Sequence, residues 1–179
     1  MNLYISDIHF GHRNIIRLDE RPFENEEEMD RAIIDKWNQK VSPEDHIYIV
    51  GDIAFRNTIP VQDYLKQLKG HKHLILGNHD GDIPNNQEAL SLLESVDDLL
   101  EINDGDRKIC LCHYPLADWN GRCKGSWLIY GHIHAMKEAP YEYMKTQERA
   151  LNAAVCINQY EPVTFDELCV NNMIFQGRF

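Results

Sequence analysis

Short apolar runs divide most of the chain and predict buried strands. They lie at residues 3–5, 47–50, 74–76, 109–111 and 127–130. Their apolar positions are nearly continuous rather than alternating, as in parallel strands that are covered on both faces. The pattern therefore indicates an α/β protein.

The segments between these runs carry the spacing of helices. Met29, Ile33 and Trp37 recur at four-residue intervals, which places them on one helix face that can pack on a sheet. The acidic stretch 24–30 suits the start of this helix, because negative charge there interacts favourably with the helix dipole. Shorter helices are expected from Pro60 to a stop at Gly70, over residues 88–93, and from the capping-box pattern of Thr164 and Glu167 through residue 168.

The order of these segments bounds the architecture. Strands and helices alternate in the first half, giving βαβ units, whereas the second half is richer in strands. The 179 residues are enough for one ordinary domain with a real core, and they contain no internal repeat or linker. We expect a single domain over residues 1–179.

Each strand-like run is followed by side chains of the types that commonly bind metal ions in proteins. These belong to Asp7, His9, Asp52, Asn78, His79, Asp80, His113, His132 and His134. Open α/β sheets bind ligands outside the carboxyl ends of their strands, where these segments should meet. Gly51, Gly77 and Gly131 precede three of the clusters and let the backbone turn sharply or approach an ion or phosphate. Together the segments predict one dinuclear metal site.

Two of these segments have one apolar residue between two ligand-type residues. Side chains alternate faces along an extended chain, so Asp7 and His9 are expected to point the same way while Ile8 points into the core. His132 and His134 are expected to repeat this arrangement.

The ordered set Asp-x-His, Gly-Asp, Gly-Asn-His-Asp, a single His and Gly-His-x-His resembles the motifs of the calcineurin-like metallophosphoesterases. Within that superfamily the chain is similar to the small single-domain prokaryotic phosphoesterases, and the similarity covers most of the sequence. The resemblance implies a four-layer α/β-β/α sandwich with the metals along one edge. It also implies an enzyme, a metal-dependent phosphoric ester hydrolase.

By this resemblance, two divalent metal ions share one set of side chains. One ion would be held by Asp7, His9, Asp52 and His134, and the other by Asp52, Asn78, His113 and His132. Asp52 would bridge them, because one carboxylate offers two oxygens to cations about 3.5–4 Å apart. Manganese or iron is the favoured metal, and zinc, nickel or cobalt is compatible with the same ligands.

Further residues are candidates for catalysis and substrate binding. Two divalent ions lower the pKa of a shared water, so a metal-bridging hydroxide is the expected nucleophile. By resemblance, His79 donates a proton or hydrogen bond to the leaving-group oxygen, and Asp80 is a candidate for orienting its imidazole. His12, Arg13 and Arg56 are candidates for contacting the substrate phosphate, with solvated side chains as the alternative.

The leading interpretation is hydrolysis of a phosphodiester or nucleotide-like substrate, with a phosphomonoesterase or a small nuclease as alternatives. Residues 53–55, Ile-Ala-Phe, replace the Asp-Arg-Gly that follows Gly-Asp in protein Ser/Thr phosphatases of the superfamily, which argues against phosphoprotein substrates. A non-catalytic scaffold is a further alternative, because a retromer subunit has this fold. Loss of ligands would favour that role, whereas every expected ligand position is present here.

The net charge of −11 limits the partners. Proteins that track nucleic acid carry a basic face, so extended nucleic-acid binding is not expected, whereas a small phosphoester can be drawn by the metals. No apolar run is long enough to span a bilayer, and no membrane association is expected. The sequence leaves the oligomeric state open.

Two features favour the cytoplasm. Five cysteines without a Cys-x-x-Cys pair suit free thiols in a reducing compartment. A cleaved signal peptide would remove part of the site, because Asp7 lies only six residues after Met1.

Two irregular loops, at 11–23 and 114–125, follow ligand segments and are expected to shape specificity. Trp119 in the second loop has two interpretations, stacking on a base or ring and packing against the domain.

Overall fold

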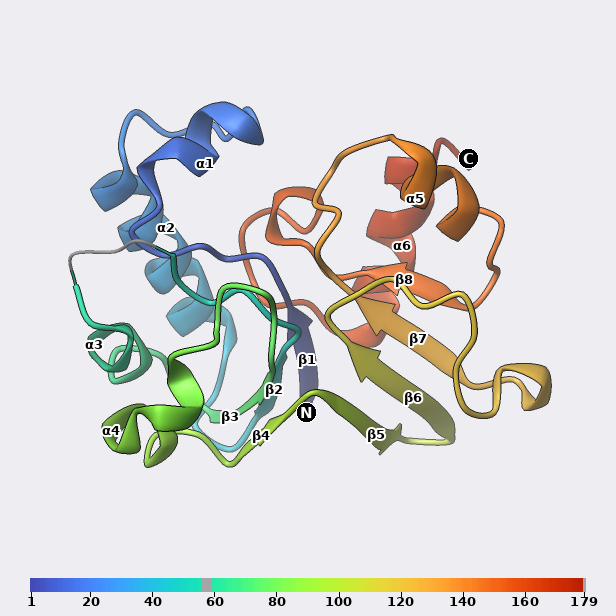
Figure 1. Ribbon diagram of the computed structural model, residues 1–179, viewed down its shortest axis with the longest axis horizontal. Helices are drawn as coiled ribbons and strands as arrows, with labels where there is room; N and C mark the ends of the chain where they lie inside the picture. The colour runs from blue at the N-terminus through green and yellow to red at the C-terminus, as the bar shows by residue number, and fades with distance from the viewer. Residues whose placement is uncertain (56–58, 179) are drawn as a thin grey trace.

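The computed structural model describes residues 1–55 and 59–178. Two four-stranded sheets face each other, with helices on their outer sides (Figure 1). The first sheet contains β1 (Asn2–Ile5), β2 (His46–Ile49), β3 (His71–Ile75) and β4 (Ser95–Asp97), and the second contains β5 (Leu99–Asp104), β6 (Arg107–Cys112), β7 (Trp127–Tyr130) and β8 (Ala150–Asn152). The helices are α1 (Arg13–Leu18), α2 (Glu26–Lys40), α3 (Val61–Leu65), α4 (Gln87–Leu90), α5 (Ala139–Met144) and α6 (Phe165–Gln176), with short turns η1 (Ile83–Asn85), η2 (Arg122–Lys124) and η3 (Val155–Ile157).

The first sheet is parallel throughout, in the order β1-β2-β3-β4. Helices connect its successive strands, which confirms the expected βαβ units. Met29, Ile33 and Trp37 of α2 are fully buried against the outer face of this sheet. The helix begins at Asn25, whose side chain accepts a hydrogen bond from the Glu28 N–H.

The second sheet starts with the antiparallel pair β5–β6 and continues with the parallel strands β7 and β8. Tyr141 and Met144 of α5 pack on its outer face with Leu128. Trp119 is buried in the same layer and donates its indole N–H to the Ser126 carbonyl oxygen at 3.3 Å. Its ring therefore packs against the domain and is not presented for base stacking.

A separate apolar core lies between the two sheets. Tyr4, Val50 and Ile75 from the first sheet meet Leu111 and Ile129 from the second. The order of layers is therefore helices, sheet, sheet and helix, which confirms the expected four-layer sandwich. Helix α6 closes one end, where Phe165 and Leu168 join this core, and no helix in the described ranges is long and apolar enough to cross a membrane.

Two of the shorter helices differ in extent from the prediction. Helix α3 begins after Pro60 but ends at Leu65, so the chain leaves the helical conformation well before Gly70. Helix α4 starts earlier than expected, because the Asn86 side chain caps its first turn by accepting a hydrogen bond from the Ala89 N–H. It also ends earlier than expected, at Leu90.

Helix α6 is longer than predicted. The capping box of Thr164 and Glu167 is present, but the helix continues to Gln176 rather than ending at residue 168. Gly177, with a φ of 68°, ends it in the left-handed conformation that favours glycine.

The carboxyl ends of β1, β2 and β3 face those of β6 and β7 at one edge of the sandwich (Figure 1). Backbone pairing of Ser6 with Ala154 joins the first sheet to the segment after β8. Five loops, drawn from both sheets, therefore meet where the sequence places its ligand-type residues.

Candidate metal centre

The strands end before the candidate ligands, whose backbone is left-handed rather than extended. Asp7, His9, Asp52, His132 and His134 have φ values of 55°, 57°, 57°, 71° and 50°. The expected alternation of faces along an extended chain is therefore wrong, although the side chains do converge. A left-handed non-glycine residue costs about 1–3 kcal/mol, so the surrounding structure must stabilise these five residues.

Three glycines make room for the side chains of ligands on other segments. A Cβ at Gly77 would clash with the carboxylate of Asp52, and one at Gly51 would clash with the His113 ring. A Cβ at Gly131 would lie 2.7 Å from a carboxylate oxygen of Asp7. The side chains that these glycines admit are those of candidate ligands, together with the hydroxyl of Ser6 beside Gly131.

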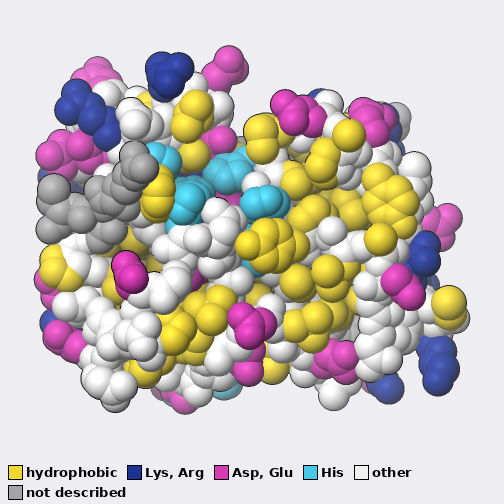
Figure 2. Space-filling view, viewed as in Figure 1, with side chains coloured by type: hydrophobic (Ala, Val, Ile, Leu, Met, Phe, Trp, Pro, Cys, Tyr) yellow, Lys and Arg dark blue, Asp and Glu magenta, His cyan; other side chains and the backbone are white. Residues whose placement is uncertain are grey.

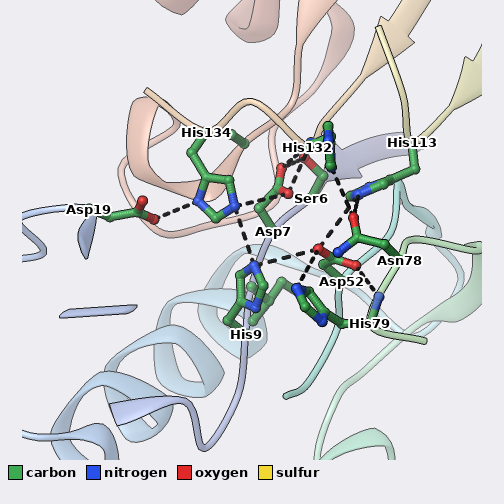
Figure 3. Close-up of polar contacts among 12 residues, drawn as sticks. Ser6, Asp7, His9, Asp19, Asp52, Asn78, His79, His113, His132 and His134 are labelled. Atoms are coloured by element: carbon green, nitrogen blue, oxygen red, sulfur yellow. Dashed lines mark hydrogen bonds and ion pairs between the residues drawn. The ribbon is translucent and has the colours of Figure 1, made fainter. Parts of the chain in front are cut away.

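Asp52 lies at the centre of the cluster (Figure 3). Its Oδ2 is 3.6 Å from Nε2 of His9, 3.5 Å from Nε2 of His113 and 3.9 Å from Nε2 of His79. Its Oδ1 accepts the backbone N–H of His79 at 2.9 Å. The side chain is only 2% exposed. One buried carboxylate thus touches groups from both sheets, which is the position a bridging ligand requires.

The other candidate ligands surround this carboxylate. Three groups have donor atoms within 4.8 Å of one another: Asp7, His9 and His134; His9, Asp52 and His79; and Asp7, Asp52 and His113. Asn78 completes the cluster, because its Oδ1 lies 3.2 Å from Nε2 of His113 and 2.9 Å from Nδ1 of His132. All seven residues predicted to be ligands are therefore brought together.

The buried ring of His113 is held in one tautomer. Its Nδ1 lies 2.9 Å from the Val50 carbonyl oxygen, which can only accept, so Nδ1 carries the proton. Nε2 faces Oδ2 of Asp52 at 3.5 Å, and the His113 side chain is 0% exposed. A positive charge between this ring nitrogen and the buried carboxylate, whether a proton or a metal ion, satisfies both groups. The donor set therefore fits a metal ion.

His134 has the same arrangement. Its Nδ1 lies 2.7 Å from a carboxylate oxygen of Asp19, whereas Nε2 faces Oδ1 of Asp7 at 3.5 Å and Nε2 of His9 at 3.3 Å. Burial lowers the pKa of His134, but the hydrogen bond to Asp19 and the charge of Asp7 outweigh it and raise the pKa overall. Burial lowers the pKa of His9 and keeps that ring neutral. A proton on His134 supplies the positive charge that a metal ion would replace.

A layer of polar residues behind the ligands escaped the sequence analysis. Arg21 is buried and donates to the carboxylate of Asp19 at 2.9 Å and to the backbone carbonyl oxygens of Asp7 and Ile8 at 2.8 Å. Ser6 donates its hydroxyl to a carboxylate oxygen of Asp7 at 2.6 Å. These contacts fix the carboxylate, the backbone and the imidazole that form one half of the site.

Asp80 has a different role from the one expected for it. Its two carboxylate oxygens accept backbone N–H groups of Asp52, Ile53 and Gly77 at 2.7, 3.0 and 2.8 Å. Burial raises the pKa of Asp80, and these hydrogen bonds oppose that effect. Asp80 therefore ties the Asp52 loop to the Gly77 loop instead of orienting the imidazole of His79.

The remaining candidates lie at different distances from the cluster. The His79 side chain is 28% exposed and its ring centroid is 5.4 Å from that of His9. The ring of His12 is also 5.4 Å from that of His9. The Arg13 side chain is 78% exposed and lies 3.8 Å from a Glu26 carboxylate, so it faces solvent. Arg56 lies outside the described residues.

The two facing sheets and the largely buried Asp-His-Asn cluster define an α/β protein with a candidate metal centre. The chain belongs to the calcineurin-like phosphoesterase superfamily, whose domain model matches residues 1–155. The match spans all seven candidate ligands and confirms the resemblance found in the sequence motifs.

Individual relatives are similar over most of the chain. The chain is 31% identical over 164 residues to the uncharacterized protein MJ1445 of Methanocaldococcus jannaschii, which covers 90% of this chain and 85% of that protein. It is 29% identical over 159 residues to the Gene 66 protein of Mycobacterium phage L5, covering 74% of this chain and 76% of that protein. The solved structure of AQ665, a protein of unknown function from Aquifex aeolicus, is 28% identical with a TM-score of 0.74 and covers 93% of this chain and 96% of that one.

Proposed function

We propose that this protein is a dinuclear-metal-dependent phosphoesterase that hydrolyses a phosphodiester or nucleotide-like substrate. The observation that carries the proposal is Nε2 of His113 facing the Asp52 carboxylate at full burial while Nδ1 is bonded to the Val50 carbonyl oxygen, because a metal ion between the two groups would bind both. Membership of the phosphoesterase superfamily supports the same reaction class.

The proposed ligand sets follow the two halves of the cluster. Asp7, His9, Asp52 and His134 would hold one divalent ion, and Asp52, Asn78, His113 and His132 the other. Bound divalent ions would supply an activated water and would stabilise negative charge on the phosphoryl oxygens. We favour manganese or iron for this oxygen and nitrogen ligand set.

The roles of the side chains follow from their positions. Asp52 holds the two halves together and fixes the place of the phosphoryl centre. His79 is close to Asp52 but more exposed than His9, so it can reach a leaving-group oxygen and donate a proton there. Asp80 keeps the Asp52 and Gly77 loops in register, and Asp19 keeps the Nε2 of His134 directed at the site.

The substrate is proposed to be small. The net charge of −11 disfavours a long nucleic acid, whose binding depends on phosphate neutralisation by a basic face. We propose that the protein acts without a membrane and without extended nucleic-acid binding.

The proposal is tested by hydrolysis of paired 4-nitrophenyl phosphate mono- and diesters with manganese-reconstituted protein. Asp52→Asn serves as the control for contaminating phosphatases. Faster turnover of the diester supports the proposal, and faster turnover of the monoester favours a phosphomonoesterase. Activity equal to that of Asp52→Asn with every metal tested would contradict catalysis and favour a scaffold.

A further inference from the structure

Two aromatic rings contact different imidazoles around the candidate metal centre. The Phe55 ring centroid is 3.9 Å from that of His79 and 4.7 Å from that of His12. The Tyr114 ring centroid is 4.8 Å from that of His132 and 5.2 Å from that of His113. Each ring is thus in contact with an imidazole of the site. Apolar side chains lie directly beside the histidines on the molecular surface (Figure 2).

Tyr114 has an exposed ring that a bound molecule can contact. It is 45% exposed, and its hydroxyl makes no hydrogen bond to any residue that the structure describes. Tyr143 is 44% exposed, but its hydroxyl donates to the Ala117 carbonyl oxygen at 3.1 Å. The Tyr114 ring is nevertheless held in place, because it packs edge-on against the buried His113 and the half-buried His132.

The positions of the rings relate them to the two ester groups of a phosphodiester. In the proposed reaction His79 protonates the leaving group, which places the leaving group beside His79 and its neighbour Phe55. We assign the group that stays on phosphorus to the side of His113 and His132, whose rings contact Tyr114.

We propose that the substrate is a phosphoester carrying a flat organic group, such as an aryl group or a nucleobase, and that Tyr114 selects it by stacking on the group retained on phosphorus. Phe55 forms the corresponding wall on the leaving-group side. This inference rests on the proposed phosphoesterase function and adds a specificity residue to it. Aromatic stacking is tolerant of ring identity, so the selection is for flatness rather than for one base.

The test compares two diesters with the same 4-nitrophenolate leaving group, phenyl 4-nitrophenyl phosphate and methyl 4-nitrophenyl phosphate. The wild type and Tyr114→Ala are assayed for kcat/KM on both, with metal content measured alongside. We expect Tyr114→Ala to lower the phenyl-to-methyl ratio of kcat/KM by about tenfold, the order of loss seen when a stacked aromatic is truncated. Tyr114→Phe should keep the wild-type ratio, because it retains the ring.

Tyr143→Ala is the matched control, because Tyr143 is equally exposed but lies outside the site. Its ratio should equal that of the wild type. An unchanged ratio in Tyr114→Ala with full metal content would overturn the inference while leaving the phosphoesterase function intact. If the wild type hydrolyses neither ester, the proposed function fails, and binding of phenyl phosphate against methyl phosphate to the metal-loaded protein decides the inference. Equal affinities would then overturn it, and tighter binding of phenyl phosphate that Tyr114→Ala abolishes would support it.

Discussion

The first sheet carries histidines at both of its ends, and the two groups differ in chemistry. His46, His71 and His73 lie at the amino ends of β2 and β3. Nδ1 of His46 is 3.0 Å from Nε2 of His73, and Nδ1 of His71 is 2.7 Å from a Glu94 carboxylate oxygen. The rings of His46 and His71 stack with centroids 5.0 Å apart.

The cluster of His46, His71 and His73, here called the amino-end cluster, differs from the candidate metal centre in the hydrogen-bond partners and the burial of its imidazoles. In the amino-end cluster, each imidazole nitrogen in contact faces another imidazole nitrogen, a hydroxyl or a carboxylate near solvent. A proton between the two atoms of each pair makes an ordinary hydrogen bond, so no metal ion is needed there. At the carboxyl ends, ring nitrogens whose other nitrogen is already bonded face buried carboxylates, as His113 faces Asp52. The candidate metal centre therefore differs from a simple gathering of histidines in its directed ring nitrogens and its buried negative charge, which are the features that a metal ion requires.

Asp52→Asn should have the largest effect of the substitutions considered. Removing the shared charge leaves both halves of the centre without their common ligand, so we expect hydrolysis to fall by at least about 10²–10³-fold, as when a group that stabilises the transition-state charge is lost. Metal content should fall in parallel. The matched control is Glu94→Gln, which removes a carboxylate from the amino-end cluster and should change neither quantity. Full activity in Asp52→Asn would contradict the assignment.

His79→Ala should separate catalysis from metal binding. If His79 protonates the leaving group, turnover of an ester with a poor leaving group should fall about 10²–10⁴-fold while the metal content stays near that of the wild type. The loss should shrink for 4-nitrophenyl esters, because nitrophenolate needs little protonation. His73→Ala is the control at the other end of the sheet and should leave turnover unchanged. Metal loss equal to that of Asp52→Asn would show that His79 is a ligand.

Asp19→Asn should have an intermediate effect. Asp19 accepts from Nδ1 of His134 and so fixes which ring nitrogen faces the site. Loss of a carboxylate behind a metal-bound imidazole weakens metal affinity by about 10–100-fold. Titration with manganese should show this loss at one of the two ions, and high metal concentration should restore turnover. Unchanged affinity at both ions would exclude this role for Asp19.

The smallest effect is expected from the amino-end cluster. Burial and the neighbouring His46 lower the pKa of His73, so the folded state prefers the neutral ring. Stability from this preference is present above the ordinary pKa of 6.5 and is lost as the pH falls through the lowered value. His73→Gln should therefore reduce the acid-induced loss of unfolding free energy by less than about 1 kcal/mol, since the site is partly exposed. Urea unfolding of the wild type and His73→Gln at pH 7 and pH 5 measures this loss of unfolding free energy. The same loss in both proteins would refute the prediction.

The sequence was sufficient to predict the strands, the α/β layers and the position of the candidate ligands at strand ends. Residues 3–5, 47–50 and 109–111 are apolar runs followed by Asp or His, and in the structure these runs form strands with the Asp and His residues at their carboxyl ends. It was insufficient for the backbone of the ligand loops, where pairing of Asp7 and His9 with residues of the Asp52 loop overrides the extended conformation.

Polar contacts between residues far apart in the chain also could not be predicted from the sequence. Asp19 and His134 are 115 residues apart, and only the nearby Asp-x-Arg pair of Asp19 and Arg21 hinted at a buried charge network. Asp80 was singled out for its position beside His79, yet its role depends on backbone amides of a different loop. Tyr114 became a candidate only when its exposure and its contacts with two histidines were known.

The central proposal is that the Asp-His-Asn cluster at the carboxyl ends of the strands holds a pair of metal ions. Equilibrium dialysis of the folded, metal-stripped protein against Mn²⁺, followed by counting of bound metal, tests it most directly. We predict two ions per chain in the wild type, with the same number in His73→Ala and a clear loss in Asp52→Asn. Folded wild-type protein that binds none of the divalent metals tested would contradict the claim.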